Sequence, residues 1–148
     1  MKKMIRIQYL NFRVSVIFKN DERNEKLKGL FIVAAINGFL AVALGAFGAH
    51  GLEGKISEKA LNTWEKAVNY QMFHTVSILV TALAFAKFGA TNLLTAGWLF
   101  VVGILLFSGS LYLYAVTGTK FLAMITPFGG ITFLIGWVML GYAFIKIL

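Results

Sequence analysis

Four apolar stretches, each about 20 residues long, are the feature that most restricts how this chain can fold. At a helical rise of about 1.5 Å per residue, such a stretch covers the roughly 30 Å hydrocarbon core of a bilayer. A helix satisfies its own backbone hydrogen bonds in that medium. The sequence therefore predicts four transmembrane helices, over residues 30–49, 72–88, 93–116 and 127–147.

Short polar connections join these stretches and leave no room for a further domain. The longest connection contains an amphipathic segment, residues 57–70, in which Ser57 is expected to cap a helix lying at the membrane interface. The fourth stretch is expected to begin with Thr126 as its N-cap and Pro127 as its first helical residue. We therefore expect an all-α membrane protein, an up-and-down bundle of four transmembrane helices with one amphipathic interfacial helix between helices 1 and 2.

Composition excludes several classes of protein. Apolar residues make up 59% of the chain, which is too high for an ordinary soluble domain. The absence of cysteine excludes disulfides and thiolate metal ligands. No phosphate-binding loop, nucleophile elbow or paired carboxylate occurs. Proton-coupled transport would need an acidic residue within a span, and the predicted spans contain none. We expect neither an enzyme nor a bound cofactor or metal, and no nucleic acid partner.

Residues 1–28 carry eight of the fourteen basic residues and are expected to form a basic cytoplasmic tail. A second interpretation starts the protein near Leu27 and treats the tail as a gene-model extension. Basic residues favour the cytoplasmic side of a membrane, so both termini are predicted to be cytoplasmic. The excess of basic residues on the predicted cytoplasmic side depends on the tail. Without the tail, that side has three basic residues and the other side has four.

Small residues recur along the first and fourth stretches and predict close helix packing. Glycine and alanine at four-residue spacing let a neighbouring backbone approach, which compensates for the weak hydrophobic drive between helices in lipid. Asn37 is expected to hydrogen-bond to another helix, and Trp137 to face the bundle or a neighbouring subunit. The residues assigned to helix packing are Asn37, Gly38, Ala41, Gly45, Ala49, Gly129 and Gly130.

Polar residues of several helices are predicted to converge at the outer end of the bundle. In the expected topology His50 ends the first span and His74 opens the second, so both imidazoles reach the same membrane face. A metal, a polar headgroup or a small ligand could bind there, or the two histidines could have a purely structural role at helix ends. The candidate ligand or partner residues are His50, His74, Gln71, Tyr70, Glu65, Ser108, Ser110, Tyr112 and Thr126.

Four sequence blocks resemble a known family, uncharacterised protein family 0382, also called domain of unknown function 423. The resemblance covers residues 30–148 and implies a small bacterial multi-pass plasma-membrane protein with no established activity and no assigned catalytic residues. The blocks that carry it are Gly45-Ala46-Phe47-Gly48-Ala49-His50-Gly51, Tyr70-Gln71 with His74, Phe107-Ser108-Gly109-Ser110-Leu111-Tyr112, and Thr126-Pro127 with Gly129-Gly130.

Two hypotheses of function follow from the sequence. The first is a non-enzymatic accessory or interaction protein of the bacterial cell membrane, acting through its helix faces. The second is a small channel or ligand-binding membrane protein that uses the polar residues around His50 and His74. The expected partners are the lipid bilayer and either another membrane protein or a second copy of this chain.

Overall fold

The computed structural model describes the backbone of residues 2–148 and the side chains of residues 21–148. Within these residues it contains α-helices and one short π-helix, and no strand. Four helices are long and apolar enough to cross a membrane, which confirms the predicted fold class. The elements are α1 (Lys2–Ala46), η1 (Phe47–Leu52), α2 (Glu58–Phe88), α3 (Thr91–Thr117) and α4 (Lys120–Ile147).

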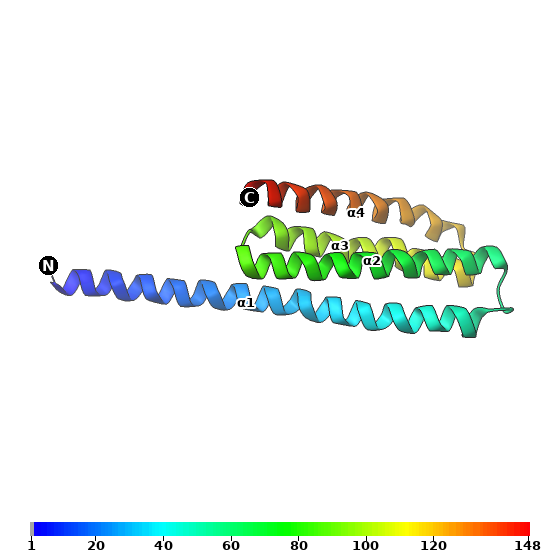
Figure 1. Cartoon of the computed structure of the whole chain (residues 1–148), viewed down its shortest axis with the longest axis horizontal. Coiled ribbons are helices and arrows are strands. Elements are labelled where there is room, and N and C mark those ends of the chain that lie inside the picture. The colour runs from blue at the N-terminus through cyan, green and yellow to red at the C-terminus, as the bar shows by residue number, and fades with distance from the viewer. Residues whose placement is uncertain (1) are drawn as a thin grey trace.

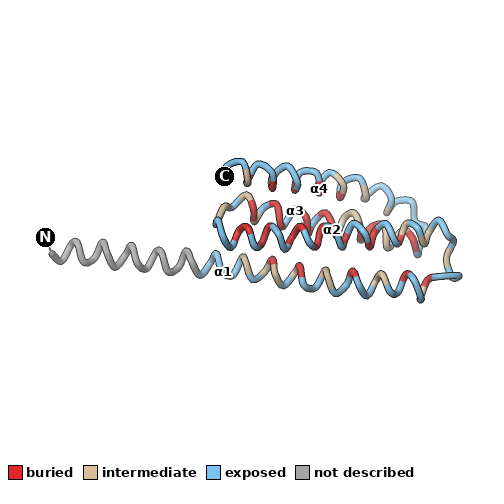
Figure 2. The backbone as a smooth tube through the Cα atoms, viewed as in Figure 1, coloured by how far each residue is buried: buried red, intermediate tan, exposed pale blue. Residues whose placement is uncertain are grey.

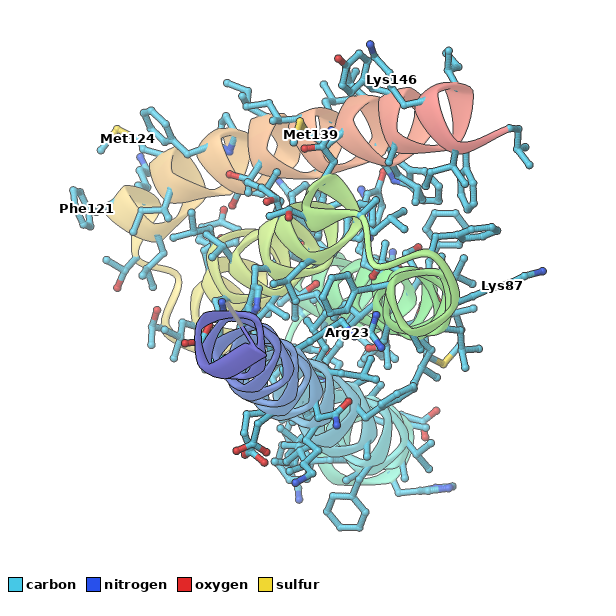
Figure 3. The ribbon with its side chains drawn as sticks, turned by 90° about the vertical axis from the view of Figure 1, so that its left-hand side faces the viewer. Arg23, Lys87, Phe121, Met124, Met139 and Lys146 are labelled. Carbon is cyan, nitrogen blue, oxygen red and sulfur yellow. The ribbon has the colours of Figure 1, made fainter. Side chains whose placement is uncertain are left out.

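The helices form three layers rather than a square bundle. Each helix packs on the next one in the chain, and α1 also touches α3. Figure 1 shows α2 and α3 in the middle, with α1 and α4 on opposite sides of this pair. Viewed from the end that holds Arg23 and Lys87, α4 runs obliquely across the pair, from Phe121 to Lys146 (Figure 3). The first and fourth helices therefore pack against the central pair.

Buried residues concentrate on the two central helices (Figure 2). Ile78 of α2, Leu93 and Phe100 of α3, and Leu30 of α1 are fully buried and belong to one apolar core. Large apolar side chains such as Phe39 and Val138 are exposed on the outer layers, as expected for surfaces that face lipid.

The predicted amphipathic helix is the first part of α2. Ser57 caps this helix, because its hydroxyl accepts a hydrogen bond from the backbone N–H of Ala60 at 3.2 Å. No glycine or proline follows before Gly89, so the helix continues through the second predicted span without a break. Its position at a lipid interface stays a prediction.

The predicted start of the fourth helix at Pro127 is wrong. The helix begins at Lys120, after Gly118 with φ +67° and Thr119 in an extended N-cap conformation. Pro127 therefore lies inside α4, where it lacks the N–H that would bond to the carbonyl of Ala123. Thr126 does not cap the helix; its hydroxyl lies 2.8 Å from that of Ser110 on α3.

The small residues of α1 face α2. A Cβ on Gly38 would lie 3.7 Å from the Thr75 methyl group, one on Gly45 would lie 3.4 Å from Val68, and Ala41 is fully buried. Ala49, at the end of this row, is exposed. Gly38 and Gly45 therefore pack against side chains of α2.

The adjacent glycines of α4 have different surroundings. Gly129 lies against the backbone of Phe107, with no room for a side chain. A Cβ on Gly130 would lie 3.9 Å from the Phe107 ring, an ordinary contact distance. The closest approach of α3 and α4 therefore depends on Gly129.

The predicted tail is continuous with the first span, since α1 begins at Lys2. The side chains of residues 1–20 lie outside the described residues. The assignment of residues 1–28 as a basic cytoplasmic tail stays a prediction, and so does the cytoplasmic location of both termini.

Candidate ligand-binding groove

The predicted convergence of the two histidines is wrong. His74 is only 3% exposed and lies near the middle of α2, next to Thr75, which faces Gly38 of α1. His50 is exposed in η1, twelve residues beyond Gly38, which is roughly 18 Å farther along the helix. The error arises because α2 begins at Glu58 and not at residue 72, so His74 is far from the helix end.

His50 lies in a π-helical turn built around a tryptophan. The Trp64 indole donates a hydrogen bond to the carbonyl of Leu44 at 2.8 Å. A Cβ on Gly48 would come within 2.7 Å of the indole. The Trp64 ring therefore fits at this position because residue 48 has no side chain. Among the described residues, no group of three or more His, Cys, Asp or Glu side chains could hold a metal.

Gln71 connects three helices through its buried amide. Its Nε2 donates to the carbonyl of Asn37 at 3.2 Å, and its Oε1 accepts from the Tyr112 hydroxyl at 2.8 Å. Asn37 thus bonds to another helix, as predicted, but through its backbone carbonyl; among the described residues its side chain donates to Val33 of its own helix. Both polar ends of the Gln71 amide are bonded, which favours a structural role.

The remaining polar candidates are dispersed. Ser110 lies beside Thr126 and also donates to the carbonyl of Phe107 at 3.0 Å. Ser108 is fully buried, and its hydroxyl has no hydrogen-bond partner within the described part of the chain. Glu65 is exposed and lines a hollow between α1 and α2 together with Ala49. These residues do not form one site.

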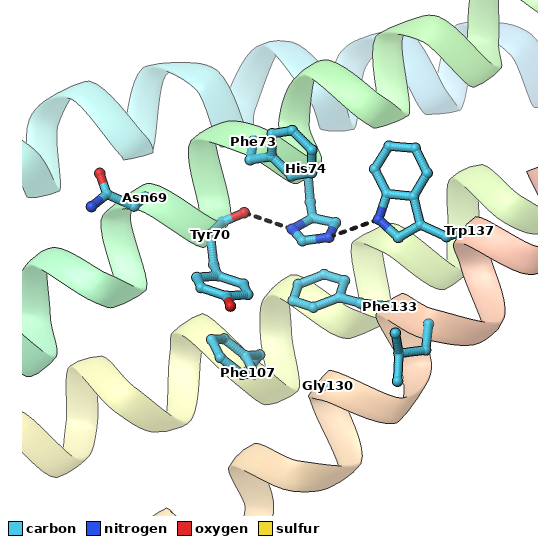
Figure 4. A pocket seen from close by; sticks show the side chains of 9 residues that line it. Asn69, Tyr70, Phe73, His74, Phe107, Gly130, Phe133 and Trp137 are labelled. Carbon is cyan, nitrogen blue, oxygen red and sulfur yellow. Dashed lines mark hydrogen bonds between the residues drawn. The ribbon is translucent and has the colours of Figure 1, made fainter.

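His74 and Tyr70 instead line an apolar groove between α2 and α4, with α3 as its floor. The groove has a volume of about 520 Å³. Figure 4 shows its aromatic rings lying close to one another. The lining residues are Asn69, Tyr70, Phe73 and His74 of α2, Phe107 of α3, and Gly130, Phe133, Leu134 and Trp137 of α4.

The hydrogen bonds of His74 define its protonation state. Its Nδ1 lies 2.8 Å from the carbonyl oxygen of Tyr70, which can only accept, so Nδ1 carries a proton. Its Nε2 accepts from the Trp137 indole N–H at 3.3 Å, so Nε2 carries none. The ring is therefore neutral, and both of its nitrogens are hydrogen-bonded.

Aromatic stacking holds the walls together. The His74 ring lies parallel to that of Phe133, with centroids 3.5 Å apart and an interplanar angle of 7°. One turn earlier on α2, Tyr70 stacks on Phe107 with ring centroids 4.4 Å apart. These contacts present ring faces and edges to whatever enters the groove.

Sequence reasoning missed much of this wall. Phe73, Phe107, Phe133 and Leu134 look like any apolar residue of a membrane span, because both lipid and a bundle interior accept apolar side chains. One signal was available: Phe133 and Trp137 are four residues apart on α4, as Tyr70 and His74 are on α2. The expectation that Trp137 faces the bundle agrees with its bond to His74.

The fold and the groove define a four-span membrane protein with an aromatic groove between α2 and α4. Residues 44–130 match the family described as "Protein of unknown function (DUF423)". The chain belongs to this family, which confirms the resemblance seen in the sequence.

Curated relatives are named membrane proteins. The UPF0382 membrane protein YwdK of Bacillus subtilis is 50% identical over 123 residues, which cover 82% of this chain and 100% of YwdK. A UPF0382 membrane protein of Staphylococcus epidermidis is 48% identical over 120 residues, covering 81% of this chain and 98% of its own length. No solved structure matches this chain.

Proposed function

We propose that this protein is a non-enzymatic binding protein of the bacterial plasma membrane that takes a hydrocarbon chain from the lipid phase into the groove between α2 and α4. The observation that carries the proposal is an apolar, aromatic groove whose one imidazole is neutral and fully hydrogen-bonded. Such a surface offers apolar contact rather than a free base or a metal ligand. This is the ligand-binding hypothesis, relocated from the predicted rim to the groove.

The groove has to compete with the bilayer for its ligand. Lipid tails are as apolar as the groove, so transfer between them gains little from the hydrophobic effect. Affinity must come from shape and from dispersion contacts with rigid rings such as Phe107 and Phe133. Two α4 residues in the wall, Leu134 and Trp137, are partly exposed, so the groove can be reached from the lipid side.

Filling the groove tests the proposal. A phenylalanine at Gly130 would extend over Phe107 into the groove, where a Cβ meets no close contact. Gly141→Phe is the matched control, because a Cβ on Gly141 has no heavy atom within 4 Å. A diazirine-bearing photoreactive fatty acid should label wild type and Gly141→Phe, and label Gly130→Phe several-fold less.

Equal labelling of the two phenylalanine variants would overturn the proposal, provided both remain folded and monodisperse. The accessory hypothesis predicts a different occupant, a transmembrane helix of another protein. A photoreactive amino acid at Leu134 that cross-links to such a helix, and not to lipid, would favour the accessory role instead.

A further inference from the structure

We propose, on the basis of the proposed groove function, that the ligand is an anionic phospholipid whose phosphate is bound by Lys66 and whose acyl chain extends along the groove toward Trp137. A second hollow, of about 430 Å³, adjoins the groove at Phe107, which lines both. We call the two hollows together the strip; residues of α2, α3 and α4 line it. The strip ends at Trp137, whose bond to His74 connects the two helices.

The second hollow is more polar than the groove. Its lining includes Lys66, Tyr114, Thr63 and Thr126. Lys66 is exposed and, among the described residues, is the one charged residue lining either hollow. An ammonium and a phenol suit a phosphodiester, which accepts hydrogen bonds but donates none. The two threonine hydroxyls already bond within the protein, Thr63 to the carbonyl of Lys59 and Thr126 to Ser110.

The distances along α2 suit a lipid with its headgroup at Lys66. Lys66 precedes His74 by eight residues, which is roughly 12 Å of helix. Lys66 shares its hollow with Pro127, near the beginning of the predicted fourth apolar stretch. A lysine at this boundary can place its ammonium among the headgroups while an acyl chain passes Phe107 toward the membrane centre.

Charge around Lys66 favours an anionic lipid over a zwitterionic one. In the described part of the chain, the ion pairs are Lys26 with Glu22 and Lys28 with Glu25, so Lys66 makes none there. The neighbouring Glu65 lines a hollow on the α1 side of α2. Among the residues that the structure describes, no carboxylate lines the strip to attract the cationic part of a zwitterionic headgroup.

Lipid retention measured by native mass spectrometry tests this inference. The protein is placed in nanodiscs of phosphatidylglycerol or of phosphatidylcholine, and the lipids that stay bound after release are counted. Wild type should retain phosphatidylglycerol preferentially, and Lys66→Ala should reduce that preference about fivefold, the effect of one lysine near an anionic surface. Lys66→Arg should keep the preference.

Lys87→Ala is the matched control, because it removes one positive charge from the last turn of the same helix, away from both hollows. If Lys87→Ala and Lys66→Ala reduce the preference equally, general surface charge explains it and the inference is wrong. If Gly130→Phe abolishes chain retention in both lipids while Lys66→Ala changes nothing, the headgroup assignment fails and the groove function stands. If Gly130→Phe leaves retention unchanged, the groove function itself fails.

Discussion

His74 of α2 accepts a hydrogen bond from the indole of Trp137 of α4, with 3.3 Å between the two nitrogens. This bond connects the two helices that border the groove. In the same place, Phe133 stacks on the imidazole and Phe100 of α3 lies beneath it, with its centroid 5.6 Å away. His74 is therefore one residue at which α2, α3 and α4 meet.

Replacing Trp137 by phenylalanine should remove the indole donor while keeping a ring in place. The Nε2 of His74 then loses its partner, and we expect the free energy of unfolding to fall by about 1 kcal/mol. Unfolding in mixed detergent micelles measures this change in the free energy of unfolding. Trp98→Phe, on the partly exposed surface of α3, is the control and should change stability by less than about 0.5 kcal/mol. Equal effects at the two tryptophans would show that the bond contributes nothing.

Gly129→Ala should destabilise the bundle far more than Gly130→Ala. A methyl group at 129 meets the backbone of Phe107, so α3 and α4 must separate, whereas one at 130 meets an ordinary contact. We expect a loss of about 1–3 kcal/mol at Gly129 and little change at Gly130. Thermal unfolding in the same detergent compares them, and the opposite order would contradict the described packing of α4.

Gly48→Ala should disturb the π-helical turn. The added methyl group would come within 2.7 Å of the Trp64 ring and displace the indole from the Leu44 carbonyl. We expect a stability loss of about 1–3 kcal/mol and a red-shifted Trp64 fluorescence. Gly109→Ala, whose methyl group has an ordinary contact at 3.9 Å, is the control. Unchanged Trp64 emission in Gly48→Ala would argue against this turn.

Single cysteines can test the predicted orientation, because the native chain has none. Lys55→Cys, in the connection before α2, should react with a membrane-impermeant maleimide added to intact cells. Thr91→Cys, exposed at the start of α3, should react only after the membrane is opened. Thr91 is preferred to Gly89, whose φ of +68° does not suit a side chain. The reverse labelling would place both termini outside.

The spans were predictable because apolar length is a local property of the sequence. Helix α3, Thr91–Thr117, contains its predicted stretch of residues 93–116, and the Ser57 cap was also evident. The first stretch, residues 30–49, lies inside a longer helical segment that begins at Lys2. The polar candidates were harder to place. The assignment of His74 to a helix end assumed that α2 starts where its apolar stretch starts. The amphipathic segment before that stretch is also helical, and it extends α2 by about four turns.

The sequence by itself determined that this protein spans a membrane four times and belongs to its family, because a long apolar helix pairs its own backbone groups inside a hydrocarbon core. Tertiary structure decided which aromatic residues face inward, which helices border the groove, and that His74 meets Trp137 while His50 lies far away. The physical reason is that lipid and protein interior are equally apolar, so an apolar side chain does not reveal which of them it faces until the helices have packed.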